Sequence, residues 1–244
     1  MLNIQDFFYR KKESDLYFDR WKKNNISEYQ KILNDKKIRT EKKYILSFLK
    51  KNINLKNKKV LEIGCFTGDL LYFLKKKYNC KVNGVESSRK ACNIAKKVFN
   101  LNINNNIFFN SCYFKKEKKN FAKFDLIICD DVLSWMDREI ILQVISSIDW
   151  LCKKKGFIFL RDFTPSKNIA VKNHHHKDEK IFNYKIKDGH KTFFLNSGKY
   201  SIVKNVKFTT ERFNKKKINH REINKWSDTI LKKLSNFNYK ILKI

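Results

Sequence analysis

The sequence predicts an α/β protein with a doubly wound, mostly parallel sheet and helices on both of its faces. Short apolar stretches alternate with segments whose apolar residues recur at helical spacing, which is typical of repeated strand and helix units. A glycine-containing turn joins the first apolar stretch to the helix that follows it. Polar residues come directly after several stretches, at the strand ends where ligands bind in such sheets.

The first predicted strand is the apolar run Val60–Ile63, interrupted by the acidic Glu62. Gly64 and Gly68 follow, and residues 69–78 continue as an amphipathic helix. Glycine allows a sharp turn and a close approach of the backbone to a ligand. A dinucleotide site would require the spacing G-x-G-x-x-G. Here three residues separate the two glycines, and Phe66 is the middle one, so the spacing argues against a dinucleotide.

The second predicted strand, residues 81–86, ends in Glu86, about 20 residues after the turn as in nucleotide-binding βαβ units. A carboxylate at this strand end can accept hydrogen bonds from both hydroxyls of a ribose. Considered alone, Glu86 is equally compatible with an ordinary solvated strand end. The turn and the carboxylate at this spacing together predict a nucleotide-like cofactor site.

The remaining elements continue the alternation, and the last two predicted strands are expected to pair antiparallel. We expect helices over residues 28–50, 88–99 and 138–151, and strands over residues 106–109, 124–129, 156–160, 200–209 and 226–234. No internal repeat or linker divides the chain, so we expect a single domain, residues 1–244. Its expected parts are an N-terminal helical cap (1–57), a cofactor-binding core (58–160) and a substrate-side insertion with the terminal hairpin (161–244).

The composition is strongly basic, with a formal net charge of +31 over 244 residues. Such a charge favours a polyanionic partner, so nucleic acid is a possible partner of the basic surface. The alternative is compositional drift, because the lysines are spread along the chain and accompany many asparagines, isoleucines and phenylalanines. Arginine, which reads phosphates and bases better than lysine does, is scarce.

The cysteines and histidines do not predict a metal site. The 6 cysteines form no C-x-x-C pair, which argues against a zinc site and a disulfide framework. Three consecutive histidines, residues 174–176, rarely point at one ion from an extended segment, so we expect no metal. There is no apolar stretch long enough to span a bilayer and no signal peptide at Met1. We therefore expect a cytoplasmic protein and leave its oligomeric state open.

The run from Glu62 to Gly68 resembles motif I of the class I S-adenosylmethionine-dependent methyltransferases, E/D-x-G-x-G-x-G, and departs from it at Phe66. More loosely, Arg161-Asp162-Phe163, Tyr184-Lys185 and Gly198-Lys199-Tyr200 are similar to small bacterial methyltransferases of the type 11 group. The resemblance implies a Rossmann-like, seven-stranded sheet with a terminal antiparallel hairpin. It also implies S-adenosylmethionine as the cofactor. The expected cofactor-binding residues are Glu62, Gly64, Cys65, Gly68, Glu86, Ser111 and Asp130.

Methyl transfer from a sulfonium is a direct displacement, in which the protein aligns the reactants and removes a proton when the acceptor requires it. The candidate catalytic residues are Asp130, Asp162 and His176. We expect the acceptor to be the oxygen, or less readily the nitrogen, of a small or sugar-like molecule. Two alternatives stay open: an RNA methyltransferase that uses the basic surface, and a non-catalytic binding module on the same fold.

Overall fold

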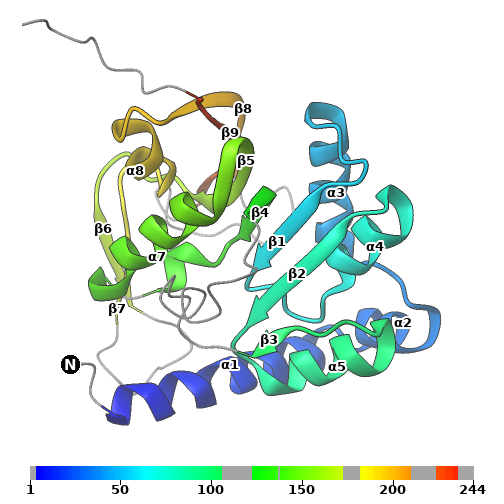
Figure 1. Cartoon of the computed structure of the whole chain (residues 1–244). Helices are drawn as coiled ribbons and strands as arrows, with labels where there is room; N and C mark the ends of the chain where they lie inside the picture. The colour runs from blue at the N-terminus through cyan, green and yellow to red at the C-terminus, as the bar shows by residue number, and fades with distance from the viewer. Residues whose placement is uncertain (1–3, 106–122, 137, 173–181, 210–223, 236–244) are drawn as a thin grey trace, which may run out of the picture. The chain divides into compact units, whose positions relative to one another are not determined.

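The computed structural model describes residues 4–105, 123–136, 138–172, 182–209 and 224–235 (Figure 1). The chain forms two compact units, residues 1–109 and 110–244. Each unit is treated below by itself, and the single domain expected from the sequence stays a prediction. Within the described residues, no helix is long and apolar enough to cross a membrane.

The first unit contains parallel strands in the order β3-β2-β1. Its elements are α1 (Ile4–Asn24), α2 (Ile26–Asp35), α3 (Thr40–Asn52), β1 (Lys59–Ile63), α4 (Asp69–Tyr78), β2 (Lys81–Glu86), α5 (Arg89–Phe99) and β3 (Asn104–Asn105). The register pairs Ile63 of β1 with Val85 of β2, so the glycine turn and Glu86 lie at the same edge. The βαβ unit predicted from the sequence is confirmed.

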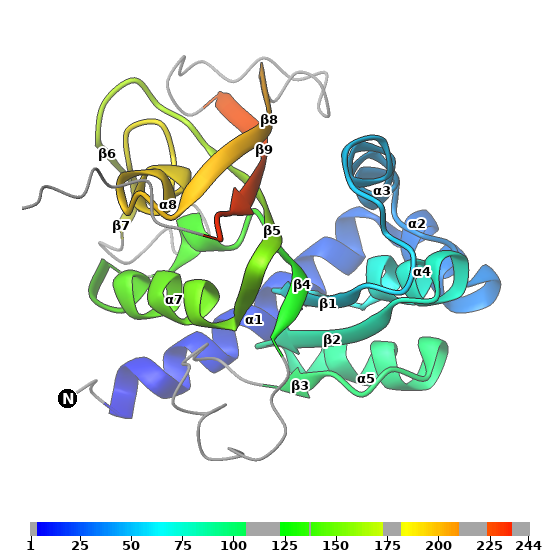
Figure 2. The ribbon, with the colours of Figure 1, turned by 45° about the horizontal axis from the view of Figure 1, so that its top comes forward.

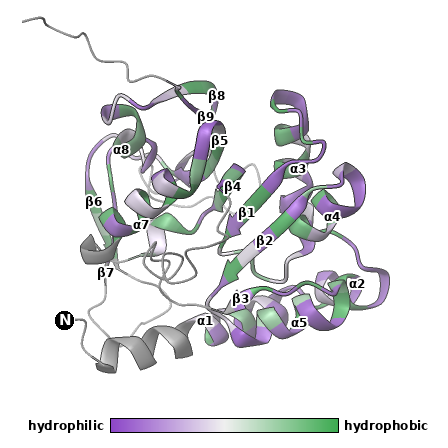
Figure 3. Ribbon diagram, in the orientation of Figure 1, coloured by the Kyte–Doolittle hydropathy of each residue, from purple (hydrophilic) through white to green (hydrophobic). Residues whose placement is uncertain are grey.

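The burial of apolar residues explains why the helices of this unit pack against its strands. β1 is buried along almost its whole length, whereas β2 changes from exposed to buried toward Glu86. Figure 3 shows that hydrophilic and hydrophobic residues are mixed along β2. Helices α3, α4 and α5 contact one another in sequence order, and α4 and α5 pack on β2. α1 runs along α2 and α5 (Figure 1). The helices therefore bury the apolar ends of the strands that carry the turn.

The glycine turn uses left-handed backbone at three positions. Gly64, Phe66 and Gly68 have φ values of 68°, 53° and 73°. A Cβ atom on Gly68 would lie 2.9 Å from Ile103 Cδ1 and 3.1 Å from Leu101 Cδ1, so this position requires glycine for its space as well as its conformation. Phe66 is the exception, since a left-handed conformation costs a non-glycine residue about 1–2 kcal/mol.

Aromatic packing offsets the conformational cost of the left-handed backbone at Phe66. Its ring is 6% exposed and lies with its centroid 5.4 Å from that of Phe18 and 5.0 Å from that of Trp21, both on α1. The Arg39 guanidinium carbon lies 4.7 Å from the centroid of the same ring. The side chain that breaks the glycine pattern is thus the contact that attaches α1 to the turn.

The sequence predicted one continuous helix over residues 28–50. This prediction is wrong, because the chain forms two separate helices there, α2 and α3. Lys36 takes a left-handed conformation that ends α2. The backbone N–H of Arg39 then donates to Asp69 Oδ2 at 2.8 Å, which fixes the chain outside a helix. Helix α5 matches its prediction closely and is capped by Ser88. The strand predicted over residues 106–109 lies outside the described residues, and β3 ends just before it.

The second unit combines two parallel strands with an antiparallel hairpin, in the order β4-β5-β9-β8 (Figure 2). Its elements are β4 (Phe124–Asp130), η1 (Leu133–Trp135), α7 (Arg138–Leu151), β5 (Cys152–Phe163), β6 (Ile169–Lys172), β7 (Phe182–Lys185), α8 (Lys191–Asn196), β8 (Tyr200–Thr209) and β9 (Lys225–Lys233). The predicted antiparallel pairing of the last two strands is confirmed, as is the α/β fold class. The segment between Asp162 and Tyr200 forms the small sheet β6-β7 and α8.

Position 66 should reverse the usual stability order of glycine and alanine. Phe66→Ala loses the aromatic packing and keeps the left-handed strain, so we expect a loss of about 3–5 kcal/mol in the free energy of unfolding. Phe66→Gly loses the same packing but relieves the backbone, and should be about 1 kcal/mol more stable than the alanine variant. Urea unfolding of both variants measures this difference. An alanine variant equal to or more stable than the glycine variant would contradict the role assigned to the turn.

Candidate functional site

The Glu86 carboxylate at the end of β2 is bound to the glycine turn at the end of β1. Glu86 Oε2 accepts the backbone N–H of Phe66 at 2.8 Å, and Oε1 accepts that of Ser88 at 2.8 Å. The N–H groups of Gly64 and Cys65 donate to the carbonyl of Val85, at 2.9 and 3.2 Å. The structure therefore brings together Gly64, Cys65, Gly68 and Glu86, as the sequence predicts.

Burial raises the pKa of the Glu86 carboxyl, although the hydrogen bonds from Ser88 and Phe66 oppose this rise. The side chain is 7% exposed. A carboxylate in this setting gains from further hydrogen-bond donors, because each donor offsets part of the cost of burying its charge. A pair of hydroxyl groups is a suitable ligand for such a carboxylate.

Glu62 lies fully buried on β1 and is paired with a cation that the sequence did not reveal. Lys42 Nζ of α3 donates to Glu62 Oε1 at 2.7 Å. Lys42 occupies the buried face of a helix whose other buried residues are apolar. A lysine at an apolar position of the helical repeat was the available signal, and it pointed to a partner carboxylate. The role of Glu62 in holding a cofactor stays a prediction.

Asp69, the first residue of α4, is a third buried carboxylate of this unit, and the sequence analysis did not single it out. It accepts the side chain of Arg39 at 3.1 Å and the hydroxyl of Thr67 at 3.0 Å. An acidic residue in the first turn of a helix is also stabilised by the helix dipole. The Arg39–Asp69 pair fixes the end of the glycine turn that leads into α4. Glu86 fixes the part of the turn nearer to β1.

In the second unit, Asp130 and Arg161 face each other at the ends of β4 and β5. Arg161 forms a bidentate pair with Asp228 of β9, at 2.7 and 3.0 Å, and its Nη1 lies 3.6 Å from Asp130 Oδ1. These three residues occupy paired positions on adjacent strands. Asp130 thus belongs to a network of charged side chains with Arg161 and Asp228. This network does not test whether Asp130 acts in catalysis or binds the cofactor, so both roles stay predictions.

Asp162, near the end of β5, accepts three hydrogen bonds. Its Oδ2 accepts from the backbone N–H of His190 and contacts His190 Nδ1, both at 2.6 Å, and its Oδ1 accepts the hydroxyl of Ser134. Burial raises the pKa of the Asp162 carboxyl, but the contacts with His190 and Ser134 outweigh burial and hold this pKa below its usual range. His190 is therefore the described histidine that joins a candidate site residue, whereas the sequence analysis selected His176 as the catalytic histidine.

Lys185 of β7 lies buried between aromatic rings beside this cluster. Its Nζ lies 4.1 Å from the centroid of Phe163 and 4.4 Å from that of Trp135, and it donates to the Ser134 carbonyl at 2.9 Å. Burial lowers the pKa of Lys185 to about 8, against the attraction of Asp131 and Asp162. Lys185 thus links the β6-β7 strand pair to η1. Because its pKa is lowered, its ammonium group loses its proton more easily than that of an exposed lysine.

Asp131 follows Asp130 with a left-handed φ of 52°, and its Oδ1 accepts the indole N–H of Trp135 at 3.1 Å. Burial raises the pKa of the Asp131 carboxyl well above its ordinary value. Lys185 opposes this rise, and the neighbouring Asp130 adds to it.

Two predicted site residues, Ser111 and His176, lie outside the described residues. The rest of the segment 174–176 lies outside them as well. Within the described part of the chain, no group of three or more histidine, cysteine, aspartate or glutamate residues is arranged to hold a metal ion. The expectation that the protein uses no metal stays a prediction.

The raised pKa of Asp131 should make the protein less stable as the pH rises. A folded-state pKa above the unfolded value means that the folded state binds more protons, so stability falls as the pH rises through the folded pKa. Asp131→Asn keeps an acceptor for Trp135 and tolerates the left-handed backbone. Its melting temperature should fall less than that of the wild type between pH 5 and pH 8. A parallel fall in both proteins would contradict a buried, proton-retaining Asp131.

Solved structures with this fold include several methyltransferases. Magnesium protoporphyrin IX methyltransferase of Synechocystis PCC 6803, solved with S-adenosylhomocysteine, is 17% identical and has a TM-score of 0.57, with 93% of this chain and 98% of that chain covered. For 1,6-didemethyltoxoflavin-N1-methyltransferase of Burkholderia thailandensis, the identity is 13%, the TM-score 0.56, and 91% of each chain is covered. The N-methyltransferase NodS of Bradyrhizobium japonicum WM9 is 13% identical, with a TM-score of 0.52 and coverage of 79% of this chain and 87% of that chain.

A curated relative, an uncharacterised protein of Rickettsia prowazekii (strain Madrid E), is 27% identical over 107 residues. This match spans 43% of the present chain and 43% of the relative's own length. The resemblance of the sequence to class I methyltransferases is confirmed by the family comparison and by the fold. A family model described as a methyltransferase domain matches residues 54–221, more than half of the sequence, and the chain therefore belongs to the methyltransferase domain family.

Proposed function

We propose that the protein transfers a methyl group from S-adenosylmethionine to an oxygen, or less readily a nitrogen, of a small or sugar-like molecule. The observation that carries this proposal is the contact between the glycine turn and the Glu86 carboxylate. That contact unites the backbone that can approach a ligand closely with the acceptor that can take up two hydroxyl hydrogen bonds. Family membership supports methyl transfer as the reaction class.

The residues of the turn fit this cofactor. At Gly68 a Cβ would meet Ile103 and Leu101, and Gly64 also has a positive φ, so both positions keep the backbone bare of side chains. Glu86 would hold the ribose, while Gly64, Cys65 and Gly68 would follow the methionine part. The cofactor supplies a methyl group on a positively charged sulfur. The protein's own contribution is to bind and orient, and to accept a proton from the acceptor.

The small-molecule class of acceptor draws support from the proteins of similar fold. One of them is named for magnesium protoporphyrin IX, another for 1,6-didemethyltoxoflavin and a third as an N-methyltransferase. Two of these names give a small-molecule acceptor, and the two that name an atom name nitrogen, so they favour a small molecule without selecting one and do not single out oxygen. The residues at the ends of β4 and β5, including Asp130 and Asp162, are the proposed acceptor-side groups.

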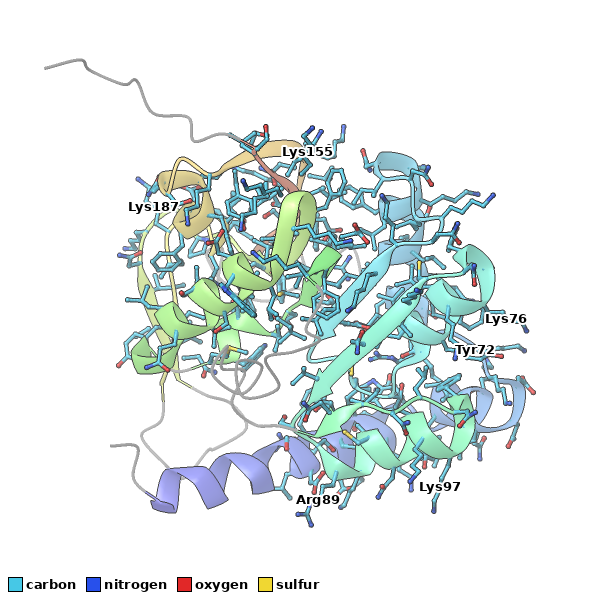
Figure 4. The ribbon with its side chains drawn as sticks, in the orientation of Figure 1. Tyr72, Lys76, Arg89, Lys97, Lys155 and Lys187 are labelled. Carbon is cyan, nitrogen blue, oxygen red and sulfur yellow. The ribbon has the colours of Figure 1, made fainter. Side chains whose placement is uncertain are left out.

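RNA is the alternative acceptor, and the surface charge favours it. Arg89, Lys97 and Lys76 project outward from α4 and α5 (Figure 4), and basic residues fill the last turns of both helices. Between Glu41 and Phe109 the acidic residues are Glu62, Asp69 and Glu86, and all three are buried. The exposed side chains of α4 and α5 therefore present cations to solvent, and the exposed Asp19 of α1 neutralises one of them by its pair with Lys90.

Removing the Glu86 charge should weaken cofactor binding while a matched surface change should not. Glu86→Gln replaces one acceptor oxygen by a donor, and we expect a 10- to 100-fold weaker affinity for S-adenosylhomocysteine, equivalent to about 1.4–2.8 kcal/mol. Asp19→Asn, which removes an exposed carboxylate paired with Lys90, is the control. Isothermal titration measures both. No binding by the wild type, or equal binding by wild type and Glu86→Gln, would contradict the proposed site.

Methyl transfer from labelled S-adenosylmethionine should label small molecules in preference to RNA. Catechol, glucosamine and total bacterial RNA serve as the three acceptors, each at low and at high salt. We expect label in the small acceptors at both salt concentrations, because a local site does not depend on released counterions. Label confined to RNA, with a steep loss as salt rises, would favour the RNA alternative instead.

A further inference from the structure

Lysines of the first unit gather at the edge of its sheet where the strands begin, opposite the glycine turn. Helices α3, α4 and α5 each carry lysines in their last turn, and each leads by a short connection into a parallel strand, β1, β2 or β3. The last turns of these helices therefore lie at the same edge. We call this surface the basic edge, and its exposed lysines are residues 50–51, 75–77 and 96–97.

The acidic residues of these helices lie at their other ends. Glu41 is in the first turn of α3, Asp69 is in the first turn of α4, and α5 contains no acidic residue. The connections from helix to strand, residues 53–58, 79–80 and 100–103, contain none either. Because an α-helix rises about 1.5 Å per residue, the acidic and basic ends of α3 are about 15 Å apart. Positive and negative charges are thus sorted along the helices.

Two simpler explanations account for only part of this sorting. A lysine in the last turn stabilises a helix through the helix dipole. The dipole does not explain Lys56 and Lys81, which are exposed at the same edge but lie outside the helices. Compositional drift would add lysines at any exposed position, but it would not remove carboxylates from one edge. The sorting therefore favours a surface that attracts a polyanion.

Half-buried aromatic rings lie among these lysines on α4. The rings of Tyr72 and Phe73 are edge to face, with centroids 5.5 Å apart. Lys76 Nζ lies 5.8 Å from the centroid of Tyr72, and Lys77 Nζ lies 5.4 Å from that of Phe73. Tyr72 and Lys76 both project outward from α4 (Figure 4). Proteins bind single-stranded nucleic acid with this combination, because rings stack on bases while cations neutralise phosphates.

We propose that the basic edge binds single-stranded RNA. A duplex suits it less, because stacked base pairs leave no free base face for the rings of α4. An anionic membrane suits it less as well. Between residues 45 and 105, all of them described, no large apolar side chain is exposed that could enter the hydrocarbon layer, and a polybasic patch is only one of the two signals that stable anchoring takes. Because the lysines of this edge lack the planar fork of arginine, binding is independent of sequence.

The basic edge and the glycine turn lie at opposite ends of the same strands. β1 has 5 residues, so about 15 Å separates its two ends. RNA held at the basic edge is therefore a partner that localises the protein, and it does not have to be the methyl acceptor. Such binding goes beyond the proposed methyl transfer and does not depend on it.

Fluorescence anisotropy with a labelled, unstructured RNA of about 12 nucleotides tests the proposal on the full chain. The triple variant Lys75→Gln/Lys76→Gln/Lys77→Gln should bind this RNA roughly tenfold more weakly at about 100 mM salt. The slope of log affinity against log salt should become shallower by about 2, because each phosphate contact of a single strand contributes about 0.7. A wild type that binds no RNA at this salt overturns the proposal.

A second triple variant, Lys23→Gln/Lys31→Gln/Lys43→Gln, is the matched control. It removes the same number of exposed lysines from the same unit, and all three lie outside the basic edge. Its affinity for RNA should stay within about threefold of the wild type. Equal losses in the two triple variants would mean that binding follows net charge alone, which overturns the assignment of the basic edge.

Tyr72→Leu separates stacking on bases from attraction of charge. Leucine keeps an apolar contact with Phe99, whose ring centroid lies 5.0 Å from that of Tyr72, but offers no aromatic face. RNA affinity should fall roughly fivefold or more while the salt slope stays unchanged. Polyglutamate of equal charge should compete poorly with RNA. Unchanged RNA affinity in Tyr72→Leu together with full competition by polyglutamate would overturn the assignment to nucleic acid. Tighter binding to phosphatidylserine vesicles than to RNA would assign the surface to a membrane instead.

Titration with S-adenosylhomocysteine separates RNA docking from the proposed function. Its affinity should stay within about twofold in the α4 triple variant, and also in wild type saturated with RNA, because the two sites are separate. A larger effect of bound RNA on this affinity would place RNA beside the cofactor and overturn a separate docking surface. A wild type that binds RNA but no S-adenosylhomocysteine contradicts only the proposed function, and the reverse result contradicts only the RNA surface.

Discussion

The hydrogen bond from the Phe66 backbone to the Glu86 carboxylate is the interaction on which the candidate cofactor site depends. It ties the turn after β1 to the end of β2, and it does so with a buried acidic group whose charge needs donors. The Arg39–Asp69 pair anchors the other half of the same turn. With both halves anchored, the turn with its left-handed residues 64, 66 and 68 is held in its conformation by a hydrogen bond and an ion pair, so a ligand would not have to organise it on binding.

Phe66 shows how a departure from a family motif can be accommodated. A bulky residue at a left-handed position costs conformational energy, and its ring would obstruct a ligand if it faced the turn. Instead, the ring packs against Phe18 and Trp21, and only its N–H faces Glu86. The N-terminal helix α1 is therefore part of the turn's support. Asp15 of α1 accepts the Ser88 hydroxyl at 2.6 Å, which attaches the same helix to the residue that follows β2.

The sequence predicted the βαβ unit, its turn and the antiparallel hairpin because these depend on local periodicity and on glycine, which are legible along the chain. It failed at the break between α2 and α3, where Arg39 leaves the helix to bind Asp69, 30 residues away. The partners Lys42 of Glu62 and His190 of Asp162 were missed for the same reason. Pairs of charged groups from distant segments carry no periodic signal, and the histidine run at 174–176 drew attention from the single His190.

The central claim is that Glu86 and the glycine turn form one binding site for S-adenosylmethionine. A crystal structure of the protein with S-adenosylhomocysteine tests it most directly. We expect the ribose hydroxyls within hydrogen-bond distance of the Glu86 carboxylate, the methionine part along residues 64–68, and the Phe66 ring still packed on α1. A ligand bound elsewhere, or a Phe66 ring that occupies the turn while Glu86 contacts no ribose, would contradict the account.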